Sequence, residues 1–172
     1  TMTELVFTER QKETIRILKK DEFKRINIFY GSVRAGKTFI SLIVWALWIA
    51  QKSKSYRYLM CAKTLKSLEQ NCLEPLVEIL GEDYCKYSIN TKRAEIFGRK
   101  IYLEGGNDST SEQKIRGMTL QGAYMDEITL IDEGFFKMLL SRLSQNGAKF
   151  FGTTNPDSPN HWLKTDFMDR AD

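Results

Sequence analysis

Several features typical of secreted or metal-stabilised proteins are scarce or missing in this sequence. The 172 residues include three cysteines, Cys61, Cys72 and Cys85, and no Cys-x-x-Cys pair. An odd number of cysteines without that spacing argues against a disulfide framework or a zinc site and predicts a reducing compartment. The N-terminus has no basic segment followed by an apolar one, so we expect no signal peptide.

Long runs of one residue class are also missing. The main apolar run covers twelve residues, 39–50, whereas a membrane-spanning helix needs about 20. We therefore expect a buried helix and no membrane partner. The 26 basic and 22 acidic residues give a net charge of +4 without a long run of one sign, which permits a nucleic-acid partner but does not require one. The length suits a single domain, 1–172.

One motif in the sequence is complete. The phosphate-binding pattern G-x-x-x-x-G-K-[ST] is filled by Gly31, Ser32, Val33, Arg34, Ala35, Gly36, Lys37 and Thr38. In this pattern the glycines let backbone N–H groups surround phosphate, Lys37 reaches the β- and γ-phosphates, and the Thr38 hydroxyl binds Mg²⁺. A β-rich run precedes the pattern and the apolar run follows it, so strand, loop and helix occur in the required order. The sequence therefore predicts a nucleoside triphosphate site.

Strand and helix patterns alternate along the chain. This predicts an α/β fold with three layers, a mostly parallel central sheet and helices on both faces. Ligands of such sheets bind beyond the carboxyl ends of the strands. A tight turn at Gly98-Arg99 predicts a small antiparallel hairpin excursion. Strands are expected at 26–30, 56–61, 87–90, 94–97, 100–103, 123–125 and 149–153, and helices at 8–18, from the loop to about 52, at 65–80 with a break or kink at Pro75, and at 132–143.

A pair of carboxylates follows the predicted strand 123–125. In P-loop NTPases an acid at the end of a buried strand helps to hold Mg²⁺, and this role falls to Asp126. Glu127 is then placed to act as general base on the attacking water. By themselves the two residues also fit a pair of solvated carboxylates at a strand end, and the complete phosphate loop upstream favours the functional interpretation.

Two further sets of polar residues fit more than one role. Arg116 and Arg34 are both candidates for the arginine that neutralises transition-state charge, in cis or from a neighbouring subunit, and position alone does not separate either from a surface ion pair. Thr153, Thr154 and Asn155 close the last predicted strand. By themselves they indicate only a turn.

Taken together, these motifs resemble the ATPase domain of the large terminase subunit of tailed bacteriophages and prophages. Residues 7–11 resemble the adenine-contacting motif of that family, with Gln11 as the base reader, and 31–38 resemble its Walker A motif. The stretch from Lys114 to Glu127 resembles the approach to Walker B. Residues 152–163 resemble the coupling motif and its flank, which assigns coupling to Thr153, Thr154 and Asn155.

The resemblance implies a function and a setting. It implies a RecA-like ATPase of the ASCE class that uses ATP and Mg²⁺ to drive double-stranded DNA into a procapsid in the host bacterial cytoplasm. It also implies a homo-oligomeric ring, expected as a pentamer, with a portal and a small terminase subunit as partners, and a monomer when the domain is isolated. The RNase H-like nuclease of the family is missing from residues 1–172, which therefore resemble an isolated ATPase domain.

The resemblance also ranks the two arginines. In some members an arginine ten residues before the Walker B aspartate acts in trans, and Arg116 matches that spacing to Asp126. In members with a cis-acting loop arginine that residue often lies four positions before the lysine, whereas Arg34 lies three before Lys37. We therefore rank Arg116 ahead of Arg34.

Two other functions fit parts of the sequence. A helicase-like translocase with a RecA-like core would need a second core domain, for which the chain has no room, and a DEAD-type box, where the sequence reads Asp-Glu-Ile-Thr at 126–129. A nucleotide-binding switch without turnover would usually lack the base that Glu127 supplies.

Overall fold

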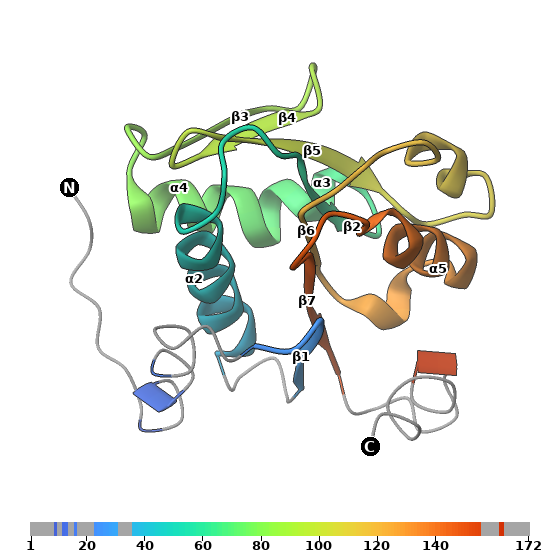
Figure 1. The fold of residues 1–172 in the computed structure, drawn as a ribbon, viewed down its shortest axis with the longest axis horizontal. Helices are drawn as coiled ribbons and strands as arrows, with labels where there is room; N and C mark the ends of the chain where they lie inside the picture. The colour runs from blue at the N-terminus through green and yellow to red at the C-terminus, as the bar shows by residue number, and fades with distance from the viewer. Residues whose placement is uncertain are drawn as a thin grey trace.

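A computed structural model of the chain describes residues 9, 12–13, 16, 23–30, 36–155 and 162–163. A seven-stranded sheet runs through the molecule in the order β1-β7-β6-β2-β5-β4-β3 (Figure 1). Its strands are β1 (Ile26–Tyr30), β2 (Tyr58–Ala62), β3 (Cys85–Ser88), β4 (Arg93–Ile96), β5 (Arg99–Gly105), β6 (Gly122–Met125) and β7 (Lys149–Thr154). The α-helices among the described elements are α2 (Lys37–Ala50), α3 (Leu65–Leu68), α4 (Glu74–Leu80) and α5 (Glu133–Arg142).

The sheet is mostly parallel, as predicted. Strands β1, β7, β6, β2 and β5 pair in parallel, and β4 and β3 continue the sheet in antiparallel pairs beyond β5. The predicted antiparallel excursion is therefore an extension of the main sheet and not a separate unit. Most observed strands begin or end within two residues of the predicted bounds, and the predicted first helix lies largely outside the described residues.

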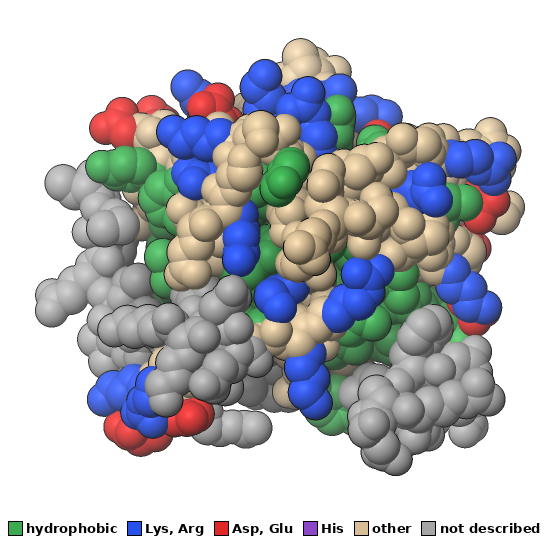
Figure 2. Space-filling view, viewed as in Figure 1, with side chains coloured by type: hydrophobic (Ala, Val, Ile, Leu, Met, Phe, Trp, Pro, Cys, Tyr) green, Lys and Arg blue, Asp and Glu red, His purple; other side chains and the backbone are tan. Residues whose placement is uncertain are grey.

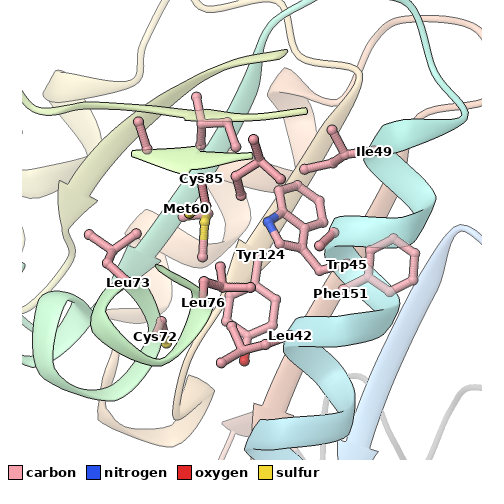
Figure 3. Close-up of a cluster of buried hydrophobic side chains, with 14 of the residues drawn as sticks. Leu42, Trp45, Ile49, Met60, Cys72, Leu73, Leu76, Cys85, Tyr124 and Phe151 are labelled. Carbon is pink, nitrogen blue, oxygen red and sulfur yellow. The ribbon is translucent and has the colours of Figure 1, made fainter. Parts of the chain in front are cut away.

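Each face of the parallel strands packs against a different helical layer, which confirms the three-layer prediction. On β2, alternate residues face opposite sides because side chains of a strand alternate. Tyr58 and Met60 join the core under α2 and α4, whereas Leu59 and Cys61 join the core under α5. The first core centres on Trp45, which contacts Tyr124 and Phe151 at ring-centroid distances of 6.0 and 5.9 Å (Figure 3).

The apolar run predicted as a buried helix forms α2. The helix ends at Ala50, slightly before the predicted position 52, and Arg99 of β5 caps its end. The guanidinium of Arg99 donates hydrogen bonds to the carbonyl oxygens of Ala50 (2.9 Å) and Lys52 (2.7 Å). These carbonyls have no partner within the helix, and a cation at a helix C-terminus is favourable. No helix in the described part of the chain is long and apolar enough to cross a bilayer.

The helix predicted at 65–80 forms with a change of geometry inside it. A π-helical segment, η2 (Glu69–Leu73), joins α3 to α4, and Pro75 lies in the first turn of α4. Proline has no N–H to donate to the carbonyl four residues earlier. The chain passes this point through a wider turn, where the sequence predicted a kink or a break, and Gly81 ends α4 as expected with a φ of 87°.

The hairpin between β4 and β5 turns one residue earlier than predicted. Its turn residues are Phe97 and Gly98, with φ values of 48° and 80°, and Arg99 already pairs with Ile96. Two positive φ values suit the twist of a two-residue hairpin, but phenylalanine rarely adopts one. Tyr84 holds Phe97 there: its carbonyl accepts the Phe97 N–H at 2.8 Å, and the two rings lie 5.6 Å apart.

Candidate functional site

The strand register brings three predicted motifs to one edge of the sheet. Tyr30, the last residue before the phosphate loop, lies opposite Thr154 on β7. Met125, which directly precedes Asp126, lies opposite Gly152 on the other side of β7. The start of the loop, the two carboxylates and the end of β7 are therefore neighbours at the carboxyl ends of parallel strands. Ligands of parallel sheets bind at this edge.

The loop joins β1 to α2 in the predicted order. Gly36 precedes the helix with a φ of 72°, a left-handed conformation that suits glycine, and its carbonyl accepts the first helical N–H from Ile40 at 3.1 Å. Helix α2 then begins at Lys37, and Thr38 lies partly buried in its first turn. The residues 31–35, with Arg34 among them, lie outside the described part of the chain, as do Gln11 and the side chain of Lys37.

One hydroxyl group connects the two carboxylate residues to β7. The hydroxyl of Thr153 donates to Oδ1 of Asp126 at 3.1 Å and accepts the backbone N–H of Glu127 at 2.9 Å. Asp126 is only 3% exposed, and its own N–H donates to the carbonyl of Cys61 on β2. Thr153 thus fixes the orientation of the buried carboxylate and of the backbone that carries Glu127.

Glu127 adopts an unusual backbone conformation. Its φ of 50° and ψ of 67° fall in the left-handed region, although the residue is not glycine. Such a conformation costs roughly 1–3 kcal/mol and is found preferentially at functional sites. The side chain lies at the surface edge of the sheet, partly buried, while Asp126 beside it is enclosed. A strained turn thus separates two adjacent carboxylates into different environments.

We predict that Thr153→Val lowers the free energy of unfolding by about 1–3 kcal/mol, because one buried and one partly buried polar group each lose a hydrogen bond. Valine has nearly the same shape as threonine but no hydroxyl, so Asp126 and the Glu127 N–H both lose a hydrogen bond. Urea denaturation of the purified variant measures the loss. Thr153→Ser keeps the hydroxyl and is the matched control. Equal stability of the valine and serine variants would contradict this role of Thr153.

The structure also reveals polar residues that the sequence did not single out. The Ser41 hydroxyl in α2 donates to the Thr38 carbonyl at 2.8 Å, so the Tyr124 hydroxyl, also 2.8 Å away, donates to Ser41. Burial raises the pKa of the Tyr124 hydroxyl and of the Cys72 thiol in η2, which keeps both groups neutral. The hydrogen bonds of Ser41 and Tyr124 link α2, the helix after the phosphate loop, to β6, the strand that precedes Asp126. The single sign of these hydrogen bonds in the sequence is a serine, Ser41, within the apolar run.

The fold and the edge geometry agree with a comparison against protein families. Residues 28–172, most of the chain, match the family described as terminase large subunit, T4likevirus-type, N-terminal. The chain belongs to this family. A comparison with curated proteins finds no match.

Solved structures of other large terminases are similar to this terminase domain. The large terminase of a thermophilic bacteriophage is 28% identical, with a TM-score of 0.84 over 96% of this chain and 43% of that one. A complex of that protein with ATP-γ-S is 27% identical, with a TM-score of 0.80. The large terminase ATPase domain of Thermus phage P74-26, 13% identical with a TM-score of 0.50 over 88% of this chain and 71% of that one, shares the fold. The chain therefore spans less than half the length of the first of these relatives.

The remaining predicted residues of this terminase domain lie around the same half of the sheet. Arg116 follows a short 3₁₀ helix and pairs with Glu112 at 2.9 Å, with 59% of its side chain exposed. Thr154 is buried at the end of β7, and Asn155 beside it is partly buried. Farther along the coupling flank, the Trp162 ring packs against Phe136 of α5 at 5.1 Å. The described contacts bring Thr153 to the carboxylates but leave Arg116 on the surface.

Proposed function

We propose that this chain hydrolyses ATP with the help of Mg²⁺ and that the hydrolysis drives double-stranded DNA into a phage procapsid. The observation that carries the proposal is the Thr153 hydroxyl, which holds Asp126 and Glu127 together at the sheet edge where the strand before the phosphate loop ends. The large terminase of the thermophilic bacteriophage, 27% identical, has been crystallised with ADP and with ATP-γ-S, which supports nucleotide binding by this chain.

In this proposal the phosphate loop binds the nucleotide. Backbone N–H groups of Gly31, Ser32, Val33, Arg34, Ala35 and Gly36 surround the phosphates, and the positive end of α2 adds to their attraction. Lys37 neutralises charge on the β- and γ-phosphates, and Gln11 reads the adenine ring. The left-handed Gly36 supports this role, because it lets α2 begin directly behind the phosphate-binding backbone.

The donor chemistry at the sheet edge fits Mg²⁺. This ion prefers oxygen ligands and is usually held by one or two protein groups together with phosphates and water. Thr38 would supply a hydroxyl and Asp126 a carboxylate, the latter oriented by Thr153. Bound Mg²⁺ would neutralise charge on the phosphates. Glu127 would take a proton from the water that attacks the γ-phosphorus, so that ADP and inorganic phosphate leave.

Membership of the large-terminase family supports a proposal for the setting of the reaction. Thr153, Thr154 and Asn155 would pass the loss of the γ-phosphate to the DNA-moving parts, and the direct contact of Thr153 with both carboxylate residues supports this role. Residues 1–172 would act as one ATPase domain. In the host cytoplasm, a ring of subunits, expected as a pentamer, would work with the portal and the small terminase subunit. The isolated domain would be monomeric, with the RNase H-like nuclease of the family outside residues 1–172.

We predict that Glu127→Gln leaves ATP binding intact and lowers turnover by at least about a hundredfold, the effect of losing a general base. Glutamine is nearly isosteric with glutamate, so the left-handed backbone and the hydrogen bond to Thr153 are retained. Phosphate release measures turnover, and a fluorescent ATP analogue measures binding. Normal turnover by this variant would show that the base lies elsewhere.

A comparison with Asp126→Ala separates the two carboxylates. Removing the proposed Mg²⁺ ligand should change the dependence of turnover on Mg²⁺ concentration, whereas Glu127→Gln should not. The same assays on the unmodified chain test the proposal as a whole. A chain that binds ATP but does not hydrolyse it, alone or with duplex DNA, would be a nucleotide-binding switch.

A further inference from the structure

The two faces of the sheet are covered unequally. On one face, α2 and the run from α3 to α4 pack under the whole width from β7 to β3. On the other face, the core beneath α5 draws its strand residues from β2, β6 and β7, with Tyr102 of β5 at its margin. That core contains no residue of β3 or β4. The outer face of β3, β4 and the amino-terminal part of β5 is therefore uncovered in the described structure.

This uncovered face forms a basic groove of about 600 Å³. Among the described residues that line it, four are cations and Glu95 is the one carboxylate. The strand register orders the side chains in two rows, with Lys86, Glu95 and Lys100 in one row and Ser88, Arg93 and Tyr102 in the next. Arg57, just before β2, is the fourth cation. Lys and Arg side chains gather over this end of the sheet, at the top of Figure 2.

The four cations of the groove are not neutralised from within the described chain. No carboxylate of the described residues lies within 4.0 Å of Arg57, Lys86, Arg93 or Lys100, whereas Lys92 on the same hairpin pairs with Glu104 at 3.8 Å. Arg93 is also held in place. Its guanidinium lies 4.2 Å from the centre of the Tyr102 ring and donates to the Lys92 carbonyl at 3.0 Å. The sheet thus presents ordered positive charge to solvent.

We propose that this basic groove binds the sugar–phosphate backbone of double-stranded DNA. The inference rests on the proposed DNA-moving function and names the surface that contacts the DNA. Lys and Arg contacts to phosphate do not depend on the base sequence. A motor that moves DNA of any sequence requires contacts of this kind. The hydroxyl groups of Ser88 and Thr91, which also line the groove, are further phosphate donors. No glycine occurs among the described residues that line the groove, whereas single nucleotides are typically bound by glycine-rich turns. This favours an extended polyanion.

The test removes three charges from the groove at once. Lys86→Gln, Arg93→Gln and Lys100→Gln are combined in this chain, and binding of a fluorescently labelled duplex of arbitrary sequence is followed by anisotropy over a range of salt concentrations. Each lost phosphate contact should reduce the slope of log Kobs against log salt by about 0.9, so we expect a reduction of about 2 to 3. We also expect the affinity at low salt to fall by roughly tenfold or more.

Two further variants separate the groove from net charge and from folding. Lys24→Gln, Lys66→Gln and Lys137→Gln remove the same charge from exposed lysines outside the groove, and this triple variant should keep the slope of the unmodified chain. Glu95→Gln removes the carboxylate from the groove and should raise the affinity by about twofold. A gain of affinity cannot result from a loss of folding, so this variant tests the groove directly.

The outcomes also distinguish this inference from the proposed ATPase function. Basal ATP turnover without DNA should be unchanged in the groove variants, because their residues belong to a different surface. The inference is overturned if the unmodified chain binds no duplex or if both triple variants lose the same slope. It is also overturned if the groove variant loses self-association in sedimentation while its DNA binding persists, since the occupant would then be an acidic surface of a second copy. A chain without ATP turnover that shows the expected DNA results would refute the proposed activity and leave the groove assignment in place.

Discussion

Replacing Lys37 by alanine is expected to lower ATP turnover by about 10³-fold or more and to weaken ATP binding. The complete phosphate loop and the left-handed Gly36 directly before α2 place this residue in the first turn of the helix behind the loop. A positive charge at that point would stabilise negative charge that develops on the phosphates during hydrolysis, and alanine removes it. Phosphate release at saturating ATP, with binding measured separately, gives the two effects.

A lysine beyond the other end of the same helix gives a matched control. Lys54 is exposed a few residues after α2, and Lys54→Ala removes the same charge from a position away from the loop. This variant should hydrolyse ATP normally. If Lys37→Ala also hydrolysed ATP at nearly the normal rate, the assignment of the phosphate site would be wrong, because that site depends on the charge of Lys37.

The parts of the fold that the sequence predicted well are those that local chemistry determines. The glycine pattern and its flanks are consecutive in the chain, and the strand β1 and the helix α2 formed as expected around them. The order of strands was not predictable in the same way. Strand β7 is inserted between β1 and β6, which are far apart in the sequence, and this pairing depends on long-range contacts that no short pattern encodes.

In the candidate site, too, local patterns were predictable and long-range contacts were not. Two adjacent carboxylates after an apolar strand predicted Asp126 and Glu127, but the hydroxyl that links them belongs to Thr153 on a neighbouring strand. The sequence named Thr153 only as a coupling residue, and its hydrogen bonds to Asp126 and Glu127 became visible once β7 was placed beside β6. The left-handed conformation of Glu127 was also hidden, because neither propensity nor periodicity predicts a strained glutamate.

Tertiary contacts explain how the structure differs from the predictions at the hairpin and at Pro75. The hairpin turned at Phe97 because contacts with Tyr84, distant in the sequence from that turn, outweighed the preference of phenylalanine for negative φ. The helix around Pro75 continued through a π-helical segment because the core contacts of Cys72 and Leu76 bury both sides of the junction. At the hairpin, packing moved the turn by one residue from its predicted place, whereas at Pro75 the helix changed its geometry where a kink or a break was predicted.

Replacing Arg116 by alanine is expected to lower ATP turnover by about 10³-fold to 10⁵-fold in the assembled ring. The turnover of the isolated chain should stay nearly unchanged. Arg116 is exposed, and its described ion pair is with Glu112, four residues earlier in the chain. Exposed pairs of this kind contribute at most about 1 kcal/mol, so the guanidinium can leave Glu112 for the nucleotide of a neighbouring subunit. An isolated domain has no neighbour, and its basal turnover should already be weak. Turnover of Arg116→Ala, measured both in the ring and in the isolated chain, tests the difference.

Mixing two inactive variants decides whether the arginine acts in trans. Subunits carrying Arg116→Ala still have the base Glu127 but cannot supply the arginine to the nucleotide of a neighbour. Glu127→Gln subunits can supply that arginine but cannot hydrolyse ATP. Rings assembled from both should regain part of the activity at mixed interfaces. Glu112→Gln, which releases Arg116 from its ion pair, should remain active and serves as a control for local disturbance. If mixing restores nothing, while Arg34→Ala alone is inactive and Arg116→Ala alone is active, the arginine acts in cis from the phosphate loop and the ranking of the two residues is reversed.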